Sequence, residues 1–428
     1  MYEIVVGRSE AERQKLGLDG SVLLGKHYVR MGETESLSNL VYLDVNHSHV
    51  VFICGKRGSG KSYTLGSIAE GMAILPPHVR KQLSVVILDT MGIFWTMKYP
   101  NKKDKALLAE WGLTGDGLDI SIYTPEGYFQ TYRDKGIPTD HSFSMLASDL
   151  TSADWCAAFD IPLSDPLGAF IEQIINALSE RSSRFSVDDI LHELAKQQNP
   201  YVAAAVNRFE NAKHWGLFSE KGTPLGDLIH PGQITVLDVS CYAGQGGSWN
   251  IRSLVIGLVA QRLFLQRMGA RKDEEYSAVQ KEVLFTRPAE LEHEPLVWLM
   301  IDEAHEFLPR EGKTPASDAL ITILREGRQP GISLVLATQQ PGKIHTDVMT
   351  QSDVIISHRI TAKLDTDALA ALTQSYMRGD LDKFLNELPR VKGAAVVLDD
   401  NNEKLFPIRV RPRQTWHGGS DPELLRKE

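Results

Sequence analysis

The sequence predicts an α/β protein built around a parallel sheet, and three observations carry that prediction. Continuous apolar runs recur along the 428 residues, separated by stretches with helical periodicity. Such unbroken runs are typical of parallel strands, which are buried on both faces. The glycine-rich segment 55–62 stands between an apolar run and a helix-like stretch, the usual context of a phosphate-binding loop. Hydrophobic residues make up 42% and charged residues 24% of the chain, which is ordinary globular usage.

Composition and periodicity divide the chain into five expected regions. The first holds short alternating runs broken by glycines and predicts a few strands, too few for a stable barrel alone. The third has mostly helical periodicity, with Asp165 and Ser186 placed as helix caps. We expect a short N-terminal β region (a reduced collar), a first part of the core, a helical insertion, a second part of the core and a C-terminal arm, at residues 1–48, 49–140, 141–232, 233–405 and 406–428. The expected core strands lie at 49–54, 83–89, 233–240, 296–304, 332–339 and 353–360.

Charge and cysteine content exclude several classes of protein. The net charge of −9 argues against a uniformly basic binder of nucleic acid but leaves room for a basic pore or stripe. The cysteines Cys54, Cys156 and Cys241 lie far apart without a CxxC pair, which predicts a reduced intracellular protein without zinc. No apolar run approaches about 18 residues and the start lacks a signal-like apolar region, so we expect a soluble, cytoplasmic protein.

Residues 55–62 match the phosphate-binding pattern GxxxxGK[ST] at every fixed position. The glycines allow consecutive backbone N–H groups to turn inward on phosphates. Lys61 would reach the β- and γ-phosphates of ATP, and Ser62 would ligate Mg²⁺. The alternative is a glycine-rich turn with an unrelated lysine. The expected nucleotide-binding residues are Gly55, Gly58, Ser59, Gly60, Lys61, Ser62 and Tyr63.

Two nearby segments look like GTPase motifs but have the wrong spacing. Residues 89–92 match DxxG, and residues 101–104 match the guanine-reading NKxD. Only eight residues separate Gly92 from Asn101, whereas one parallel crossover needs about a dozen or more. We interpret the second segment as a polar, lysine-rich loop, which sets the GTPase aside.

A second acidic motif follows the apolar run 296–301, where Asp302 and Glu303 stand side by side. A carboxylate at the end of a buried strand is costly unless it serves a metal ion or another partner. Asp302 would hold Mg²⁺ through water, and Glu303 would orient and polarise the attacking water; the alternative is a helix N-cap. Asp89 and Asp238 also end apolar runs but lack a following glutamate. The adjacent pair favours hydrolysis by water, and hence an ATPase over a kinase.

The segment 321–342 adds polar groups that can complete such a site. Gln339 lies at the tip of the expected strand, where a polar residue can sense the γ-phosphate. Arg325 and Arg328 precede that strand, and the planar fork of arginine matches phosphate oxygens. An arginine supplied across a subunit interface makes hydrolysis depend on assembly. The alternative is a solvated helix end with Glu326 as the local partner.

The segments "GKRGSGKSYTLG", "WLMIDEAHEFLP", "LREGRQPGISLVLATQQP" and "VRPRQTWHGG" resemble the HerA branch of the HerA/FtsK family, and the resemblance covers roughly residues 48–420. It implies a hexameric, RecA-like P-loop ATPase that pumps double-stranded DNA through a central pore. The resemblance implies that Arg328 is the trans arginine finger and Gln339 the strand-tip sensor. It also implies that Glu303 is the catalytic glutamate, that Lys61 contacts the phosphates and that Ser62 ligates Mg²⁺. Arg325 is a second interface candidate.

Two features depart from the family pattern. Relatives usually begin with a fuller β-barrel that forms a collar and helps to dock partners, whereas about 48 residues precede the core here. Many relatives also carry an acidic residue in the loop after the second strand, and Ile93 stands in that position.

The expected contacts with DNA are a few basic or backbone groups per subunit. The candidate pore loops are residues 98–105 and 340–353, and the alternative for both is an exposed, solvated loop. The C-terminal arm is expected to brace a neighbouring subunit, or else to touch DNA, through Arg409, Arg411 and Arg413. His305 and His417 lack metal-site spacing and receive no metal role.

Two functions remain open. The first is an ATP-driven translocase of double-stranded DNA that works with a NurA-type nuclease in DNA end processing and repair, or with an effector in antiviral defence. The second is a nucleotide-gated ring that assembles and regulates an effector enzyme without pumping DNA. A conjugation-type pump would require a membrane segment, and none is expected.

Overall fold

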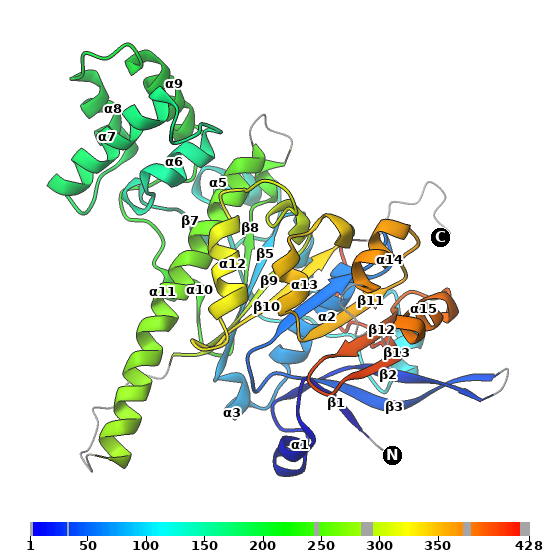
Figure 1. The fold of residues 1–428 in the computed structure, drawn as a ribbon. Coiled ribbons are helices and arrows are strands. Elements are labelled where there is room, and N and C mark those ends of the chain that lie inside the picture. The colour runs from blue at the N-terminus through cyan, green and yellow to red at the C-terminus, as the bar shows by residue number, and fades with distance from the viewer. Residues whose placement is uncertain (1–2, 32–33, 244–247, 284–293, 371–377, 420–428) are drawn as a thin grey trace.

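The computed structural model describes residues 3–31, 34–243, 248–283, 294–370 and 378–419. Within them, one mixed sheet forms the centre of the molecule (Figure 1). Its strands are β1 (Ile4–Val6), β2 (Ser21–Met31), β3 (Thr34–Asp44), β4 (Val50–Cys54), β5 (Leu83–Asp89), β6 (Ile120–Pro125), β7 (His141–Phe143), β8 (Ile234–Asp238), β9 (Leu296–Ile301), β10 (Ile332–Thr338), β11 (Val354–His358), β12 (Ala394–Asp399) and β13 (Lys404–Val410). Across the sheet they lie in the order β1-β3-β2-β13-β12-β11-β4-β10-β9-β5-β8-β6-β7.

From β11 to β7 neighbouring strands are parallel, so their carboxyl ends meet at one edge, here called the carboxyl edge. Cys54 of β4 lies opposite Thr338 of β10 and Ser357 of β11. Asp89 of β5 lies opposite Asp238 of β8. Parallel strands need crossover connections, and helices supply them here. The predicted α/β class is therefore confirmed.

The described residues form helices on both faces of this sheet and others that stand away from it (Figure 1). They are α1 (Glu10–Leu16), α2 (Lys61–Ala73), α3 (Pro77–Arg80), α4 (Lys105–Glu110), α5 (Glu126–Asp134), α6 (Ser152–Ala158), α7 (Pro166–Arg181), α8 (Val187–Ala195), α9 (Val202–Lys213), α10 (Leu225–Leu228), α11 (Ser248–Glu282), α12 (Ser317–Glu326), α13 (Thr346–Gln351), α14 (Lys363–Ala370) and α15 (Arg378–Glu387). Along β4, Phe52 and Cys54 enter the core shared with α11 and α12, whereas Val51 and Ile53 enter the core shared with α2. Burial on both faces explains why these strands are unbroken apolar runs.

Helices α6 to α9 form an outcrop at one end of the molecule, within the predicted helical insertion (Figure 1). Asp165 and Ser186 cap α7 and α8, because each side chain accepts a hydrogen bond from a backbone N–H of the first turn. Trp155 is fully buried in the outcrop, and its ring centroid lies 5.0 Å from that of Phe209. The outcrop is therefore held by an aromatic core.

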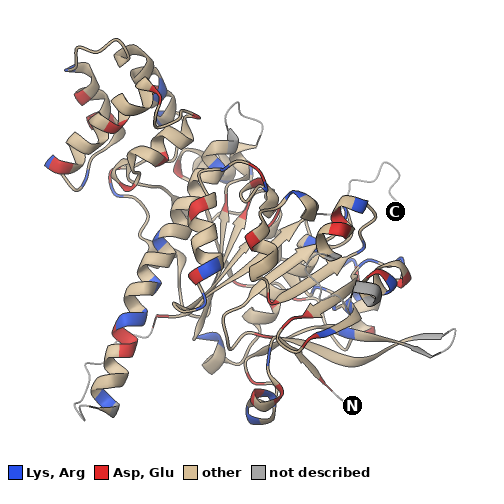
Figure 2. Ribbon diagram, in the orientation of Figure 1, with Lys and Arg blue, Asp and Glu red and all other residues tan. Residues whose placement is uncertain are grey.

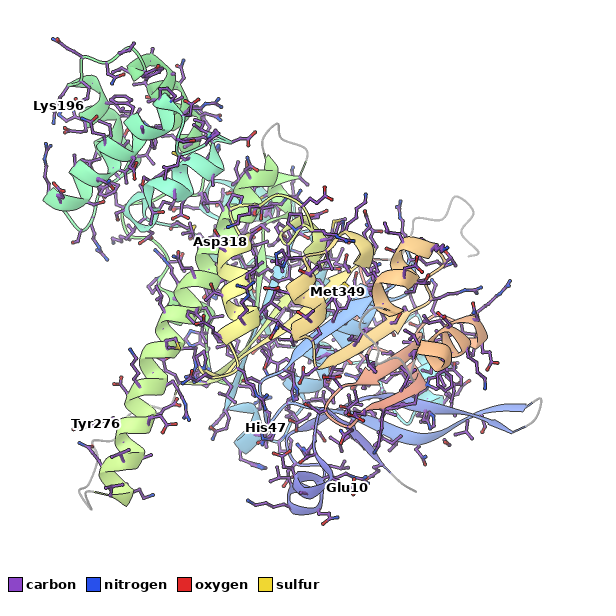
Figure 3. The ribbon with its side chains drawn as sticks, in the orientation of Figure 1. Glu10, His47, Lys196, Tyr276, Asp318 and Met349 are labelled. Atoms are coloured by element: carbon purple, nitrogen blue, oxygen red, sulfur yellow. The ribbon has the colours of Figure 1, made fainter. Side chains whose placement is uncertain are left out.

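Helix α11 is much longer than the strands that it covers. Its 35 residues span roughly 50 Å, whereas the seven residues of β10 span roughly 23 Å. The second half of α11 consequently projects past the sheet, and Figure 3 places Tyr276 on this projecting part. The first half is buried, with Leu254 and Leu258 in the core.

The N-terminal strands continue the core sheet, because β2 pairs with β13, β13 with β12 and β12 with β11. Beside them, Arg8 and Asp44 form a fully buried ion pair of 2.5 Å. His49 lies between Asp44 at 3.0 Å and Asp353 at 2.6 Å, which ties β3 to the start of β4 and β11. The predicted boundary at residue 406 falls inside β13. The division into five regions stays a prediction.

Candidate nucleotide-binding and catalytic site

The glycine-rich segment 55–62 forms the loop that joins β4 to α2 at the carboxyl edge. Gly58 and Gly60 have φ angles of 72° and 112°, which L side chains rarely adopt. A Cβ atom on Gly55 would lie 2.6 Å from Ser59 Oγ, so a larger residue would force the loop open. The hydroxyl of Ser59 is buried and has no hydrogen-bond partner among the described residues. The loop therefore has the tight backbone and the unpaired donor expected of a phosphate cradle.

Helix α2 begins at Lys61 and no side chain caps its N-terminus. The backbone N–H groups of its first turn consequently present positive partial charge to the loop, which favours an anion. Lys61 is only 6% exposed, and its Nζ donates to the backbone oxygen of Lys56 at 3.3 Å. Burial lowers the pKa of Lys61, while Glu303 and Asp302 favour its charged form. The lysine thus stands between the loop and the two carboxyl groups.

Asp302 directly follows β9 and is buried. It accepts hydrogen bonds from the hydroxyl of Ser62 and, at 2.9 Å, from the backbone N–H of Glu303. Burial raises the pKa of Asp302, and Ser62 and Lys61 act in the opposite direction. A buried carboxyl beside a serine hydroxyl fits Mg²⁺, because hard cations take oxygen ligands and would stabilise the ionised acid.

Glu303 occupies the left-handed region of backbone space, with φ 52° and ψ 41°. For a residue other than glycine this conformation is strained, and such strain clusters at functional sites. Burial raises the pKa of Glu303, as does Asp302, while Lys61 and the backbone N–H of Gln339 lower it. Its Oε2 is buried and accepts no hydrogen bond from the described residues. The structure therefore holds one oxygen of this carboxyl without a proton donor, beside Lys61.

His305 links Glu303 to the tip of β10, a role that the sequence did not reveal. Its Nδ1 lies 3.0 Å from the hydroxyl oxygen of Thr338 and 3.5 Å from Glu303 Oε2. Its Nε2 lies 3.4 Å from Gln340 Nε2. Burial lowers the pKa of His305 to about 4, so the ring is neutral at physiological pH. The only available signal was its position two residues after the Asp-Glu pair.

Arg325 and Arg328 lie far from the loop of their own chain. Arg328 follows α12 in the turn before β10, at the edge of the sheet opposite Gln339. The length of β10 separates Arg328 from Gln339 by roughly 20 Å. Arg328 is exposed, and its side chain forms no hydrogen bond or ion pair with the described residues. Arg325 Nε instead donates to Asp347 Oδ2 at 2.6 Å within the same chain.

A family model described as the central domain of the helicase HerA matches residues 24–247, just over half of the chain. The chain belongs to this HerA family. It is 26% identical over 183 residues to the DNA double-strand break repair helicase HerA of Pyrococcus furiosus, an alignment that covers 40% of this chain and 31% of that protein. The chain spans about a third of the length of the curated relatives it matches, 31% of one and 35% of another.

Two solved structures share the fold. VirB4 of Thermoanaerobacter pseudethanolicus superposes with a TM-score of 0.54 at 13% identity, over 92% of this chain and 97% of that one. The bacterial conjugative coupling protein TrwBΔN70 gives 0.50 at 11% identity, over 92% and 95%. These likenesses confirm the predicted RecA-like fold, and the HerA family match confirms the predicted class, a P-loop ATPase. Within the described residues, no helix is both long and apolar enough to cross a membrane.

The C-terminal segment of this HerA-family chain does not reach outward as predicted. Arg411 and Arg413 are each 1% exposed and lie against Glu70 of α2 in the same chain. Arg411 Nη1 donates to Glu70 at 2.5 Å, and the backbone N–H of Arg413 donates to the hydroxyl oxygen of Tyr63 at 2.6 Å. The expectation that both arginines brace a neighbour or touch DNA is wrong, because a buried carboxylate in their own chain binds them. Residues 420–428 of the predicted arm lie outside the described residues.

The same contacts place Tyr63 against the C-terminal segment. Its ring centroid lies 5.2 Å from that of His417 in an edge-to-face arrangement. Arg413 lies over the Tyr63 ring at 5.9 Å. Tyr63 therefore anchors the segment that follows β13, and its contact with the nucleotide stays a prediction.

The candidate pore loop 98–105 is also bound within its own chain. Lys98 pairs with Asp140 at 2.6 Å, and Asn101 Nδ2 donates to the backbone oxygen of Arg413 at 2.9 Å. The Nζ of Lys103 lies 4.4 Å from the centre of the Trp416 ring. The second candidate, 340–353, contains the short helix η5 (Pro341–Lys343) and α13. Its backbone is held by neighbouring segments, since the backbone N–H of Arg310 donates to the oxygen of Lys343 at 2.8 Å.

Asp89 and Asp238, which lack a following glutamate, form a second buried carboxyl pair at the carboxyl edge. Asp89 accepts hydrogen bonds from the backbone N–H groups of Gly92 and Phe94, both at 2.8 Å. Burial and the neighbouring Asp238 raise the pKa of Asp89 to about 8. The DxxG-like segment is thus a turn closed by its own aspartate. Ile93, in the position that is acidic in many relatives, packs against the core around α2.

Proposed function

We propose that this chain hydrolyses ATP at the carboxyl edge in a ring of six copies, and that the ring drives double-stranded DNA through its centre. The observation that carries the proposal is the place of Arg328, which is exposed and lies about 20 Å from the strand tip of its own chain. In the described part of the chain this site brings together one buried lysine and two carboxyl groups, and a further cationic side chain would help to stabilise the charge that develops on the phosphates. A neighbouring copy that presents Arg328 would complete the site.

The residues of the site divide the work as follows. The loop N–H groups and Lys61 bind and orient the phosphates, and Ser62 and Asp302 hold Mg²⁺, which when bound supplies charge neutralisation. Glu303 orients the attacking water and accepts its proton at Oε2, the oxygen without a donor among the described residues. His305 and the backbone N–H of Gln339 fix the position of that carboxyl.

The proposed substrate and setting rest on the relatives. One of them carries the name of a DNA double-strand break repair helicase. By that likeness we propose DNA end processing with a nuclease of the NurA type, or antiviral defence with another effector, in the cytoplasm. The catalytic residues in this proposal are Glu303, Lys61, Arg328 and Gln339, and Arg325 is a second interface candidate.

The test is the rate of ATP hydrolysis with and without long duplex DNA, on protein whose oligomeric mass has been measured. A hexamer whose hydrolysis rises several-fold with duplex supports the motor. Glu303→Gln serves as the control for contaminating ATPases, because its preparation should lack turnover. Absence of both DNA stimulation and DNA binding at low salt would contradict the motor.

A specific observation favours a second candidate, the nucleotide-gated scaffold. Lys98 pairs with Asp140, and the side-chain amide of Asn101 donates to the backbone oxygen of Arg413, which ties part of the first candidate pore loop to its own chain. Figure 2 shows Lys and Arg interspersed with Asp and Glu and not gathered in one band. For a scaffold, ATP would change the affinity of the ring for its effector while duplex DNA would leave the hydrolysis rate unchanged. The same assay therefore separates the two functions.

A further inference from the structure

The turn 327–331 carries Arg328 and is closed by its own backbone. The N–H of Ile332 donates to the oxygen of Gly327 at 2.8 Å, and the N–H of Gly331 donates to the oxygen of Arg328 at 3.3 Å. Because the Arg328 side chain has no partner among the described residues, the backbone of this turn sets the position and direction from which that side chain leaves the chain.

A second arginine, Arg267 of α11, is hydrogen-bonded to this turn. Its side chain is 1% exposed, and its Nε donates to the backbone oxygen of Pro330 at 2.9 Å. Its Nη1 donates to the backbone oxygen of Glu294 at 3.1 Å and lies 3.4 Å from the carboxylate of Glu274. The Arg267 guanidinium thus binds two backbone oxygens and one partly exposed carboxylate. The two backbone oxygens belong to the segments that lead into β10 and β9.

The turn is shaped around this guanidinium group. Gly331 has a φ of 82°, and a Cβ atom there would lie 3.3 Å from Arg267 Nη2 and 2.5 Å from Leu296 Cδ2. No larger residue fits between the two side chains without moving one of them. The Nη2 of Arg267 is buried and lacks a hydrogen-bond partner among the described residues, so the side chain retains an uncompensated polar group. A hydrophobic residue would fill this space without that cost.

We propose that Arg267 is a positioning residue for Arg328: it fixes the turn 327–331 so that Arg328 meets the phosphates bound by the neighbouring copy. This inference rests on the proposed function, because Arg328 acts only in an assembled ring. A buried guanidinium is favoured at this position because its planar fork ties the turn to α11 by directed hydrogen bonds. A displacement of about 1 Å at a catalytic group can cost roughly 100-fold in rate.

The first experiment compares Arg267→Met with the wild type. We expect the kcat for ATP hydrolysis to fall by roughly 10- to 100-fold, as for a displaced catalytic group. The dissociation constant of an ATP analogue and the oligomeric mass should remain unchanged, because the P-loop of the same subunit is untouched. Arg271→Met is the matched control, since Arg271 lies four residues along α11 and pairs with Glu274 at 3.2 Å but is not bonded to the turn. It should retain the wild-type kcat.

The second experiment mixes two inactive variants. Lys61→Ala subunits have a defective P-loop and an intact turn 327–331. Arg267→Met subunits have an intact P-loop and a displaced turn. In a head-to-tail ring formed by random mixing, roughly a quarter of the sites combine an intact P-loop with an intact neighbouring turn. We expect hydrolysis to recover to about that fraction of the wild-type rate. If Arg267→Met subunits fold and assemble but the mixed rings show no recovery, the proposal is overturned.

Two further variants keep the inference separate from the proposed function. Arg267→Lys retains one donor for Pro330 and should lose less kcat than Arg267→Met, which carries the test if the methionine variant does not fold. If the wild type neither assembles nor hydrolyses ATP, or if Arg328→Ala remains active, the proposed function fails. Two outcomes would overturn the positioning role alone, given an inactive Arg328→Ala. In the first, both Arg267 variants keep the wild-type kcat. In the second, they lose ATP affinity as well as kcat.

Discussion

Two glutamates beside helix α2 have opposite surroundings. Glu70, on α2, accepts hydrogen bonds from Arg411 at 2.5 Å and from the backbone and hydroxyl of Thr415, both at 2.9 Å. Burial would raise the pKa of Glu70, but the arginines and backbone donors lower it below its ordinary value. Glu303 faces the start of α2, where burial raises its pKa and its Oε2 has no hydrogen-bond partner among the described residues.

The difference separates a structural cluster from a functional one. Both carboxyl groups are removed from water, which is costly for a charge that lacks partners. The chain compensates that cost fully at Glu70, where the partners come from the segment after β13. At Glu303 it leaves the cost partly uncompensated and adds a strained backbone. An unsatisfied acid beside a phosphate loop is expected where a ligand or a water completes the site.

The sharpest test of this comparison is Glu303→Gln. If the carboxyl accepts a proton from the attacking water, the amide cannot, and we expect turnover to fall by ~10²–10⁴-fold. ATP binding should persist, because Lys61 and the loop are unchanged. Single-turnover hydrolysis and equilibrium binding of labelled ATP measure the two effects separately. Turnover within a few-fold of the wild type would remove Glu303 from the chemistry.

The matching change in the structural cluster is Glu70→Ala. Removal of one partner from a buried ion pair leaves the other charge uncompensated, and we expect a loss of about 3–5 kcal/mol in unfolding free energy. Glu70→Gln is the milder variant, since its amide oxygen can still accept from the backbone of Thr415. Chemical denaturation of the three proteins gives the order. A melting temperature for Glu70→Ala equal to that of the wild type would contradict the assignment.

The pH dependence of stability should also differ between the two glutamates. A carboxyl with a raised folded-state pKa binds its proton more tightly when folded, so stability falls as pH rises through that pKa. Glu303→Gln should therefore melt at a higher temperature than the nucleotide-free wild type above this pH, with no gain at lower pH.

Glu70 should show the opposite sign. Its folded-state pKa is lowered, so its contribution is present above the ordinary glutamate pKa and is lost as pH falls through the folded value. Melting curves of Glu303→Gln and Glu70→Gln from about pH 2 to about pH 8 check the two signs. If the melting temperatures of the two variants, relative to the wild type, change with pH in the same direction, the distinction between the two glutamates is wrong.

The smallest effect is expected at Arg325. Its guanidinium is mostly exposed and already pairs with Asp347 at 2.6 Å. Arg325→Ala should therefore lower the unfolding free energy by about 0.2–1 kcal/mol. Hydrolysis should fall much less than in Arg328→Ala, because Arg328 has no competing partner among the described residues. Equal losses of turnover in the two variants would place both arginines at the neighbouring nucleotide.

Much of the fold could be predicted because its signals are local. The strands at 83–89 and 332–339, the caps at Asp165 and Ser186, and the helix after the glycine loop depend on residues a few positions apart. The place of the N-terminal strands could not be predicted in this way. It depends on the pairing of β2 with β13, which are separated by most of the chain.

The sequence by itself determined the composition of the site. Phosphate binding needs a glycine loop with a lysine and a serine in fixed succession, and hydrolysis needs two carboxyl groups at the end of one strand. Both patterns are contiguous, so the chain displays them directly. Lys61 and Glu303 were predicted for this reason.

Only the tertiary structure decided which basic residues face outward. Arg411 and Glu70 are 341 positions apart, and nothing in the local sequence of either indicates that they pair. The same holds for Arg267, whose contact with Pro330 depends on how α11 lies against the sheet. A charge is exposed or buried according to what folds against it, and that partner is chosen by long-range packing. Arg328 remains exposed in this fold, whereas Arg411 and Arg413 do not.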